Sequence, residues 1–233
     1  MALSLRGTSQ GGQASGATIT SALPAGVAAN DVLYFWVWGK AAGQTFTTPS
    51  GYTQITGSPY GTAGEGKAAI FRKVAGGSES APSSTKGDSA DRDRWIIIAI
   101  TGADTTTPEQ DSDFTETTDY ATNPTMPTSA AGGNTVWSVV FMGTARTAGE
   151  TPTWPTGWVE DLEEHGGVFE TRNFLARNTS PGTGSIGGST ITVATERGQE
   201  KVVQILVKEA GAAAGVAKRS TIINQAVNRA ANW

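Results

Sequence analysis

The chain has 233 residues, with 30 glycines, 10 prolines and no cysteine, and its formal net charge is −4. The lack of cysteine excludes disulfides and thiolate metal sites. The slight acidity argues against general nucleic-acid binding, which needs a basic face. A chain of this length can bury a sizeable core as one domain, and its many glycines and prolines are typical of short strands joined by turns.

Residues 1–29 are polar and glycine-rich, with short strand candidates at residues 3–8 and 17–21. Residues 1–7 lack the basic region and apolar run of a secretory signal. No apolar stretch approaches the roughly 18 residues that a membrane-spanning helix requires. We therefore expect a chain made in a cytoplasm, without a membrane partner.

The first strong strand candidate covers residues 32–38, which are apolar on both faces of the strand. A strand with one solvated face would alternate apolar and polar residues. Either the chain itself covers both faces of this strand, or Trp36 and Trp38 belong to an aromatic row that another protein chain covers. Both interpretations stay open from the sequence.

One stretch of the sequence is written twice. Residues 42–52 (AGQTFTTPSGY) recur as residues 148–158 (AGETPTWPTGW), 106 positions later. Each copy contains a Pro-x-Gly-aromatic turn, because proline presets the corner of the turn and glycine accepts a conformation closed to other residues. A repeat of this length predicts two related halves of one fold.

The strands around the two loops also correspond. At the same offset Phe35 falls on Phe141. Residues 68–74 correspond loosely to residues 171–177, and residues 95–100 correspond to residues 202–207. We therefore predict one domain over residues 1–209, with internal repeats at about 30–104 and 134–208.

The charged run at residues 91–94 is expected to flank a strand and to stay solvated. Residues 102–133 are expected to cross between the halves and to contribute one or two edge strands. Within them, the acidic segment from Asp111 to Asp119 is dense in oxygen ligands, and calcium binding there stays open.

Catalytic chemistry is not indicated by the sequence, and we expect no enzyme activity, cofactor or metal centre. The single histidine, His165, lies in an acidic turn without a second imidazole. No serine lies in a Gly-x-Ser-x-Gly elbow. Among the tryptophans, Trp95, Trp137 and Trp158 are expected in the core. Trp154 is a candidate for binding a ligand such as a sugar.

The tail after residue 209 changes character. Residues 210–215 are an Ala/Gly linker, and a short helix is expected beyond Ser220. An isolated helix of this length is marginal in water, so the apolar face must dock, and we expect it to bind a partner. The face consists chiefly of Ile222, Ile223, Val227 and Trp233.

The order of these signals resembles a family of β-sandwich proteins common in phage and prophage genomes. The signals are a short acidic turn and an apolar strand at residues 30–35, a Pro-x-Gly-aromatic turn at residues 49–52 and an aromatic-basic strand at residues 70–74. They continue with Gly-Ala-Asp at residues 102–104, and the second half repeats the turn at residues 155–158. The similarity covers roughly residues 17–208. The Trp-rich first strand and the tail depart from it.

The resemblance implies a non-enzymatic structural protein of a virion, made in the host bacterial cytoplasm. It fits a capsid decoration protein or a minor tail protein whose partners are other virion proteins or copies of itself. The alternative is a carbohydrate- or receptor-binding module that attaches to a host surface glycan. The expected fold is a pseudo-duplicated antiparallel β-sandwich of jelly-roll type, in which each half contributes strands to both sheets, with a short C-terminal helix.

Overall fold

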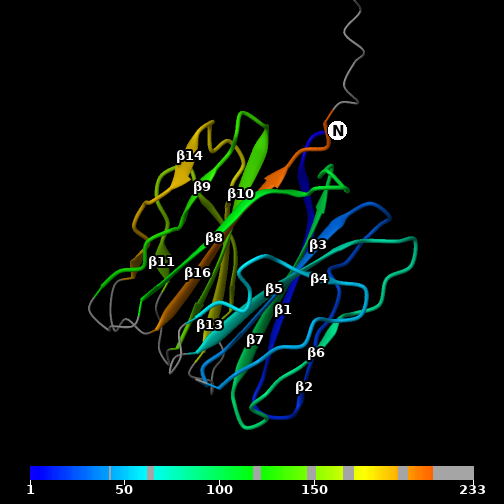
Figure 1. The fold of residues 1–233 in the computed structure, drawn as a ribbon, viewed down its shortest axis with the longest axis vertical. Helices are drawn as coiled ribbons and strands as arrows, with labels where there is room; N and C mark the ends of the chain where they lie inside the picture. Colours follow the sequence, from blue (N-terminus) through cyan, green and yellow to red (C-terminus); the bar gives the residue numbers. More distant parts are fainter. Residues whose placement is uncertain are drawn as a thin grey trace, which may run out of the picture.

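The computed structural model describes residues 1–41, 43–61, 66–117, 122–145, 151–164, 171–193 and 199–211, which form strands and loops (Figure 1). The all-β class expected from the sequence is confirmed for this part of the chain. Over the same ranges, no helix is long and apolar enough to cross a membrane.

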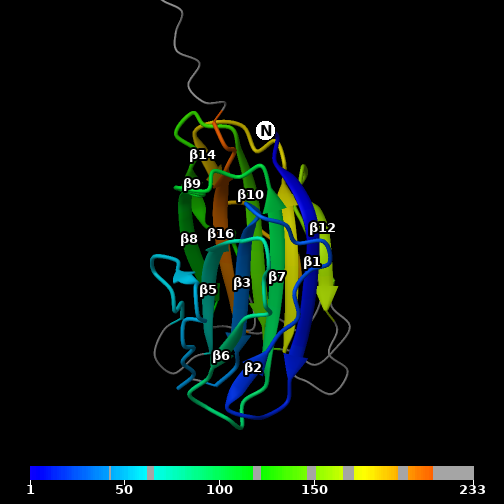
Figure 2. The same ribbon diagram turned by 90° about the vertical axis from the view of Figure 1, so that its right-hand side faces the viewer.

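Ten strands form two five-stranded antiparallel sheets that pack face to face as a sandwich. In spatial order, the first sheet consists of β1 (Ser4–Gln13), β7 (Asp93–Thr101), β3 (Val32–Gly39), β5 (Lys67–Val74) and β4 (Thr53–Gln54). The second consists of β12 (Val159–Glu164), β13 (Arg172–Asn178), β10 (Val136–Thr144), β16 (Glu200–Lys208) and β8 (Glu109–Thr117). The strands run nearly along the long axis of the molecule (Figure 2).

Each half of the chain forms one complete sheet. The order β1, β7, β3, β5, β4 in the first half is matched by β8, β16, β10, β13, β12 in the second. Our expectation that each half would contribute strands to both sheets, as in a jelly roll, is therefore wrong. Strands of one half pair with one another because sequential strands usually become neighbours through short connections.

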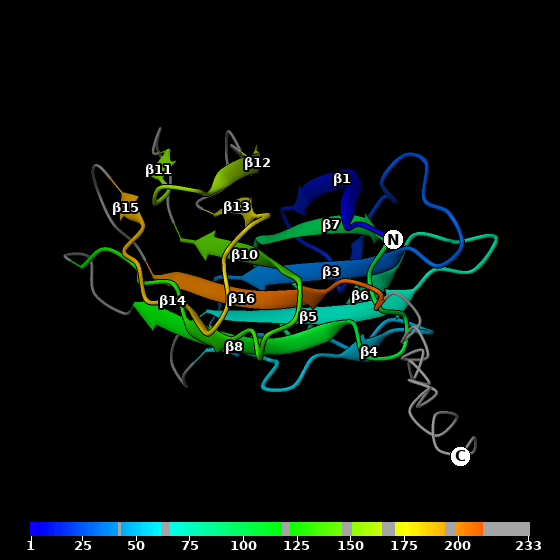
Figure 3. The same ribbon diagram turned by 90° about the horizontal axis from the view of Figure 1, so that it is seen from above.

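An approximate two-fold axis parallel to the strands relates the two sheets. The central strands β3 and β10 face each other and run in the same direction (Figure 3). On one side of them β7 lies against β13 and β1 lies against β12, and on the other side β4 and β8 form the second pair of edges. Each edge of the sandwich therefore combines one outer strand from each half.

The offset between the halves is not the same in strands and loops. Trp36, which pairs with Ile70, and Phe141, which pairs with Leu175, face the core between the sheets, whereas Phe35 faces outward. The equivalent strand positions therefore differ by 105. Because side chains alternate along a strand, one residue of offset exchanges the two faces. The predicted match of Phe35 with Phe141 is thus wrong by one residue, and the match of residues 68–74 with residues 171–177 is wrong by two, which keeps the face.

Other expected matches are confirmed. Ile96 pairs with Trp36 as Val203 pairs with Phe141, which gives the offset of 107 expected for residues 95–100 and 202–207. The amide of Tyr52 donates to the carbonyl of Pro49 over 3.1 Å, and the equivalent turn of the second half closes in the same way over 3.1 Å.

Short strands in the loops cover the outer faces of the two sheets. These pairs are β2 (Thr18–Thr20) with β6 (Ser83–Thr85), β9 (Thr128–Ala130) with β14 (Ser185–Gly187), and β11 (Pro152–Thr153) with β15 (Thr192–Val193). The first half replaces the last pair by a bridge between Phe46 and Lys86. The duplication therefore includes the covering loops as well as the sheets.

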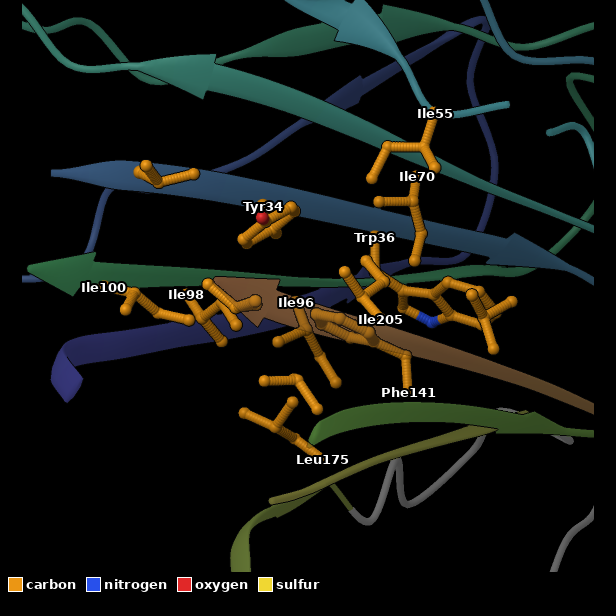
Figure 4. Packing of buried hydrophobic residues seen from close by; sticks show 14 of the residues in the cluster. Tyr34, Trp36, Ile55, Ile70, Ile96, Ile98, Ile100, Phe141, Leu175 and Ile205 are labelled. Carbon is orange, nitrogen blue, oxygen red and sulfur yellow. The ribbon is translucent and has the colours of Figure 1, made fainter. Parts of the chain in front are cut away.

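The main core lies between the sheets (Figure 4). Trp36 stacks on Phe141 at its centre, with ring centroids 5.8 Å apart and planes inclined by 20°. Three isoleucines of β7 line one side of this core in a row, namely Ile96, Ile98 and Ile100. Burial of this shared layer contributes about 25 cal/mol per Å² of apolar surface, so each sheet is stabilised by the other.

The outer faces are also buried, under the chain's own loops. Leu33, Phe35 and Val37 form a second cluster beneath the loops of the first half. This explains why β3 is apolar on both faces. Trp36 and Trp38 are both 0% exposed and point into the layer between the sheets. The hypothesis that they form a partner-binding face is therefore wrong.

Charged residues at the start of β7 are buried as well. Asp93 is 1% exposed and Arg94 is 2% exposed, so the expectation that the run at residues 91–94 stays solvated is wrong for these two residues, whereas Arg92 is exposed. Asp93 forms an ion pair with the buried Lys86, and Arg94 Nε donates to the carbonyl oxygen of Thr171 over 3.0 Å. At the matching place in β16 stand Glu200 and Lys201, both 0% exposed, so the repeat preserves an acid followed by a base.

Both described ends of the chain lie at one end of the sandwich (Figure 1). The terminal amino group of Met1 is 3.9 Å from the Glu209 carboxylate. The amide of Ala210 donates to the carbonyl of Gly102 over 2.8 Å. The described chain stops at Gly211, so the expected helix and most of the linker lie outside the described residues.

Candidate functional site

The sequence-predicted site residues have different outcomes. Ile222, Ile223, Val227 and Trp233 lie outside the described residues. Trp36 and Trp38 are buried in the core between the sheets and present no surface to a partner. Trp154 is the remaining candidate, and it is partly exposed on the outer face of the second sheet.

Trp154 stacks on Trp158, with ring centroids 6.4 Å apart and planes inclined by 25°. Its indole N–H donates to Glu160 over 2.6 Å, which fixes the ring. Thr151 donates to Glu163 in the same neighbourhood over 3.2 Å. The arrangement offers two partly exposed, nearly parallel aromatic rings beside a carboxylate.

The first half has no equivalent of this pair. At the loop offset of 106, Trp158 corresponds to Tyr52 and Trp154 corresponds to Thr48. Tyr52 is buried against Phe35, with ring centroids 6.4 Å apart in an edge-on arrangement. The turn therefore needs one aromatic residue in each half, and Trp154 is an addition that the repeated architecture does not require.

A second candidate site is a crevice at the β4/β8 edge of the sandwich. Its volume is about 400 Å³. It is lined by Thr53, Gln54, Ile55, Thr56 and Arg72 from the first sheet and by Glu109, Gln110, Asp111 and Ser112 from the second. It lies within the size range of small-molecule sites.

An ion pair links the two sheets at this crevice. Arg72 Nη1 donates to Glu109 Oε2, and the side chains are 24% and 17% exposed. The hydroxyl of Tyr34 is buried in the same region. Burial, and after it the negative charge of Glu109, raises the pKa of Tyr34 well above its ordinary value. Tyr34 therefore keeps its proton throughout the physiological range.

The loop that forms one wall of the crevice is held in place. The ring of Tyr60 stacks on Phe114 of β8, with centroids 4.9 Å apart and planes inclined by 23°. The Tyr60 hydroxyl donates to the carbonyl of Thr56 over 3.2 Å. Gln54 Nε2 donates to the carbonyl of Ser58. The wall is thus fixed by contacts on both sides.

The acidic segment considered for calcium is occupied with backbone contacts. The Asp111 carboxylate accepts from the amides of Ser112, over 2.9 Å, and Ala130, over 2.7 Å. Asp113 accepts from the amide of Phe114 over 2.8 Å. Within the described ranges, no group of three or more acidic or histidine side chains is placed to hold a metal ion. Asp119 and His165 lie outside those ranges.

The sequence alone does not predict the crevice. Arg72 lies in an aromatic-basic strand and Glu109 in the connector between the halves, and no local pattern indicates that the two side chains meet. Their pairing depends on which edges of the two sheets lie together, and no local pattern encodes that.

No protein-family model matches this sequence, and neither a curated protein nor a solved structure matches it.

Proposed function

We propose that this chain is a non-enzymatic structural protein of a bacteriophage virion, either a capsid decoration protein or a minor tail protein. In this proposal it is made in the host bacterial cytoplasm and docks on other virion proteins, or on copies of itself, through the tail after Gly211.

One observation carries the proposal: the chain's own elements cover both faces of its sheets. Buried clusters lie between the sheets and beneath the loops on each outer side. Such a domain forms its hydrophobic core without a partner protein. Its edges, loops and tail then remain available for contacts with other subunits. An accessory protein added to an assembled particle needs this kind of self-sufficient body.

Two further features support the proposal. The ordered motifs of the sequence resemble a family of phage and prophage β-sandwich proteins. The tail combines a small-residue linker with an apolar helical pattern at Ile222, Ile223, Val227 and Trp233, and the described chain ends at one end of the sandwich, at Gly211. A tether leaving from an end can reach a partner without disturbing the sheets.

Incorporation into particles tests the proposal. Mass spectrometry of purified virions is expected to detect the full chain, and to lose it when Ile222 and Val227 are both replaced by Asp. The matched control replaces Asn224 and Asn228 by Asp, which adds the same charge to the opposite face of the expected helix and should leave incorporation intact. Absence of the full chain from particles would contradict the proposal.

A second candidate function is binding of a host-surface carbohydrate or receptor through Trp154. The stacked, partly exposed pair of Trp154 and Trp158 beside Glu160 favours this function, because partly solvent-exposed tryptophan and tyrosine side chains are enriched at binding surfaces. Purified protein should then bind host cells or a glycan array, lose binding on Trp154→Ala and keep most of it on Trp154→Phe. Equal binding by the wild type and by Trp154→Ala would rule out this surface.

A further inference from the structure

The two edges of the sandwich are equivalent by the internal repeat, yet the described residues fill them differently. At the β1/β12 edge, Leu5 and Leu162 pack against the inter-sheet core. Arg177, the counterpart of Arg72 at the strand offset of 105, lies over the Trp137 ring at 4.9 Å and donates twice to Asp161, over 2.5 and 2.9 Å. That edge is sealed by apolar and aromatic contacts.

At the β4/β8 edge the corresponding arginine reaches across to the other sheet. Arg72 pairs with Glu109 of β8, and the crevice of about 400 Å³ opens beside the pair. β4 has two residues, whereas its counterpart β12 has six. The short strand leaves space that the longer one fills on the opposite edge.

The lining of the crevice is rich in hydrogen-bonding groups and nearly neutral. Its uncharged polar side chains are Thr53, Gln54, Thr56, Gln110 and Ser112. Hydroxyls and amides both donate and accept hydrogen bonds. Arg72 and Glu109 neutralise each other, and backbone amides engage both oxygens of Asp111. Ile55 adds one apolar contact.

One carboxylate of the lining is within reach of a ligand. Glu109 lines the crevice and its side chain is 17% exposed, so a bound hydroxyl group can contact the exposed part of it, beside the ion pair with Arg72. The other oxygen, Oε1, is buried next to the Tyr34 hydroxyl, and a hydrogen bond between Tyr34 and Glu109 is one cause of the raised pKa of Tyr34.

We propose that this crevice binds a short neutral oligosaccharide. Sugar hydroxyls donate and accept hydrogen bonds, as the side chains of the lining do. Because Arg72 pairs with Glu109 and both oxygens of Asp111 accept from backbone amides, the lining offers an ionic ligand no unpaired opposite charge. An apolar ligand would leave the lining amides and hydroxyls unpaired at a cost. The site is separate from Trp154 and does not depend on the virion role.

The test is titration of the ¹⁵N-labelled full chain with maltotriose, cellotriose and triacetylchitotriose, followed by nuclear magnetic resonance. At least one of them should shift the amide signals of residues 53–56 and 109–112 at millimolar concentration. Glu109→Gln keeps the shape but replaces the carboxylate by a neutral amide, and should weaken binding about five- to tenfold, the difference between a hydrogen bond to a charged group and one to a neutral group.

Thr56→Trp places a bulky side chain at the crevice mouth and should abolish the shifts. The matched control, Thr183→Trp, makes the same change at an exposed loop position of the second half and should bind as the wild type does. Trp154→Ala should also leave binding unchanged, which separates this site from the Trp154 surface. A circular-dichroism melt of each variant establishes that it is folded.

Two results would overturn the proposal. One is that none of the three saccharides shifts the crevice signals of the wild type. The other is that a saccharide binds but a folded Thr56→Trp variant retains the full affinity.

Discussion

Trp36 and Phe141 occupy equivalent positions in the two halves of the chain, and they stack on each other across the middle of the sandwich, 5.8 Å apart. The approximate two-fold axis passes between them. The same relationship recurs one step along the strands, where the Trp38 indole lies over Gly143. Contacts between equivalent positions therefore hold the sheets together at the centre.

The stack should be energetically coupled. Phe141→Ala is expected to lower the free energy of unfolding by about 3–5 kcal/mol. In a double-mutant cycle in urea, Trp36→Leu and Phe141→Leu should show a coupling energy of about 0.5–1.5 kcal/mol. A cycle of Trp36→Leu with Phe174→Leu is the control, because Phe174 faces the outer side of the second sheet. Equal coupling in both cycles would contradict the special contact.

Gly143 should tolerate no side chain. A Cβ atom added there would lie 2.6 Å from Cγ of Trp38, closer than packing allows. We expect Gly143→Ala to lower stability by about 1–3 kcal/mol, the usual cost of overpacking a core. Gly77→Ala is the control, since a Cβ there meets nothing within 4 Å. Thermal denaturation of both variants checks the difference, and similar melting temperatures would refute it.

The buried pair of Lys86 and Asp93 should make stability depend on pH. Burial raises the pKa of Asp93 to about 7, partly offset by Lys86. A carboxyl whose pKa is raised on folding stabilises the fold at low pH, and this contribution is lost as the pH rises through the folded value. Lys86→Met removes the offsetting charge and raises the pKa of Asp93 further.

Urea unfolding near pH 8 should therefore show Lys86→Met destabilised by about 3–5 kcal/mol. The deficit should shrink near pH 5, where Asp93 binds a proton in the folded variant. Lys208→Met is the control, because Lys208 pairs with Asp104 and both side chains are partly exposed, so the change should cost no more than about 1 kcal/mol at either pH. A deficit for Lys86→Met that is independent of pH would disprove the coupling.

Neither half should fold alone, although each forms a whole sheet. The inner faces bury their residues only against each other, so residues 1–106 or 107–233 expressed separately would expose an apolar layer. We expect no cooperative thermal transition from either fragment, and recovery of the native near-ultraviolet circular dichroism when the two are mixed. A cooperative transition of one fragment alone would show that the halves are independent domains.

Much of the architecture could be predicted from the sequence. The repeated Pro-x-Gly-aromatic turn predicts that the chain has two related halves. The apolar runs predict the central strands β3, β7, β10 and β16. The sequence does not show that Phe35 lies on the outer face of its sheet and Phe141 on the inner face. The offset between the halves is one residue smaller in these strands than in the loops, and a shift of one residue moves every side chain to the opposite face.

Two other features were out of reach for physical reasons. Polar residues at the start of a strand are usually solvated, so Asp93 and Arg94 gave no sign that loops would bury them. The crevice joins residues 53–56 to residues 109–112, and only the stacking of complete sheets brings these segments together.

The covalent link between the halves has a consequence for how this molecule can diversify. In a symmetric dimer of identical subunits, every substitution appears at both edges, and the two edges stay self-complementary copies. Here a substitution alters one edge alone. The hollow at β4/β8, the sealed seam at β1/β12 and the single tryptophan pair thus give the body distinguishable sides. A protein with distinguishable sides can attach with one of them and present another outward, which a two-fold dimer of the same size cannot do.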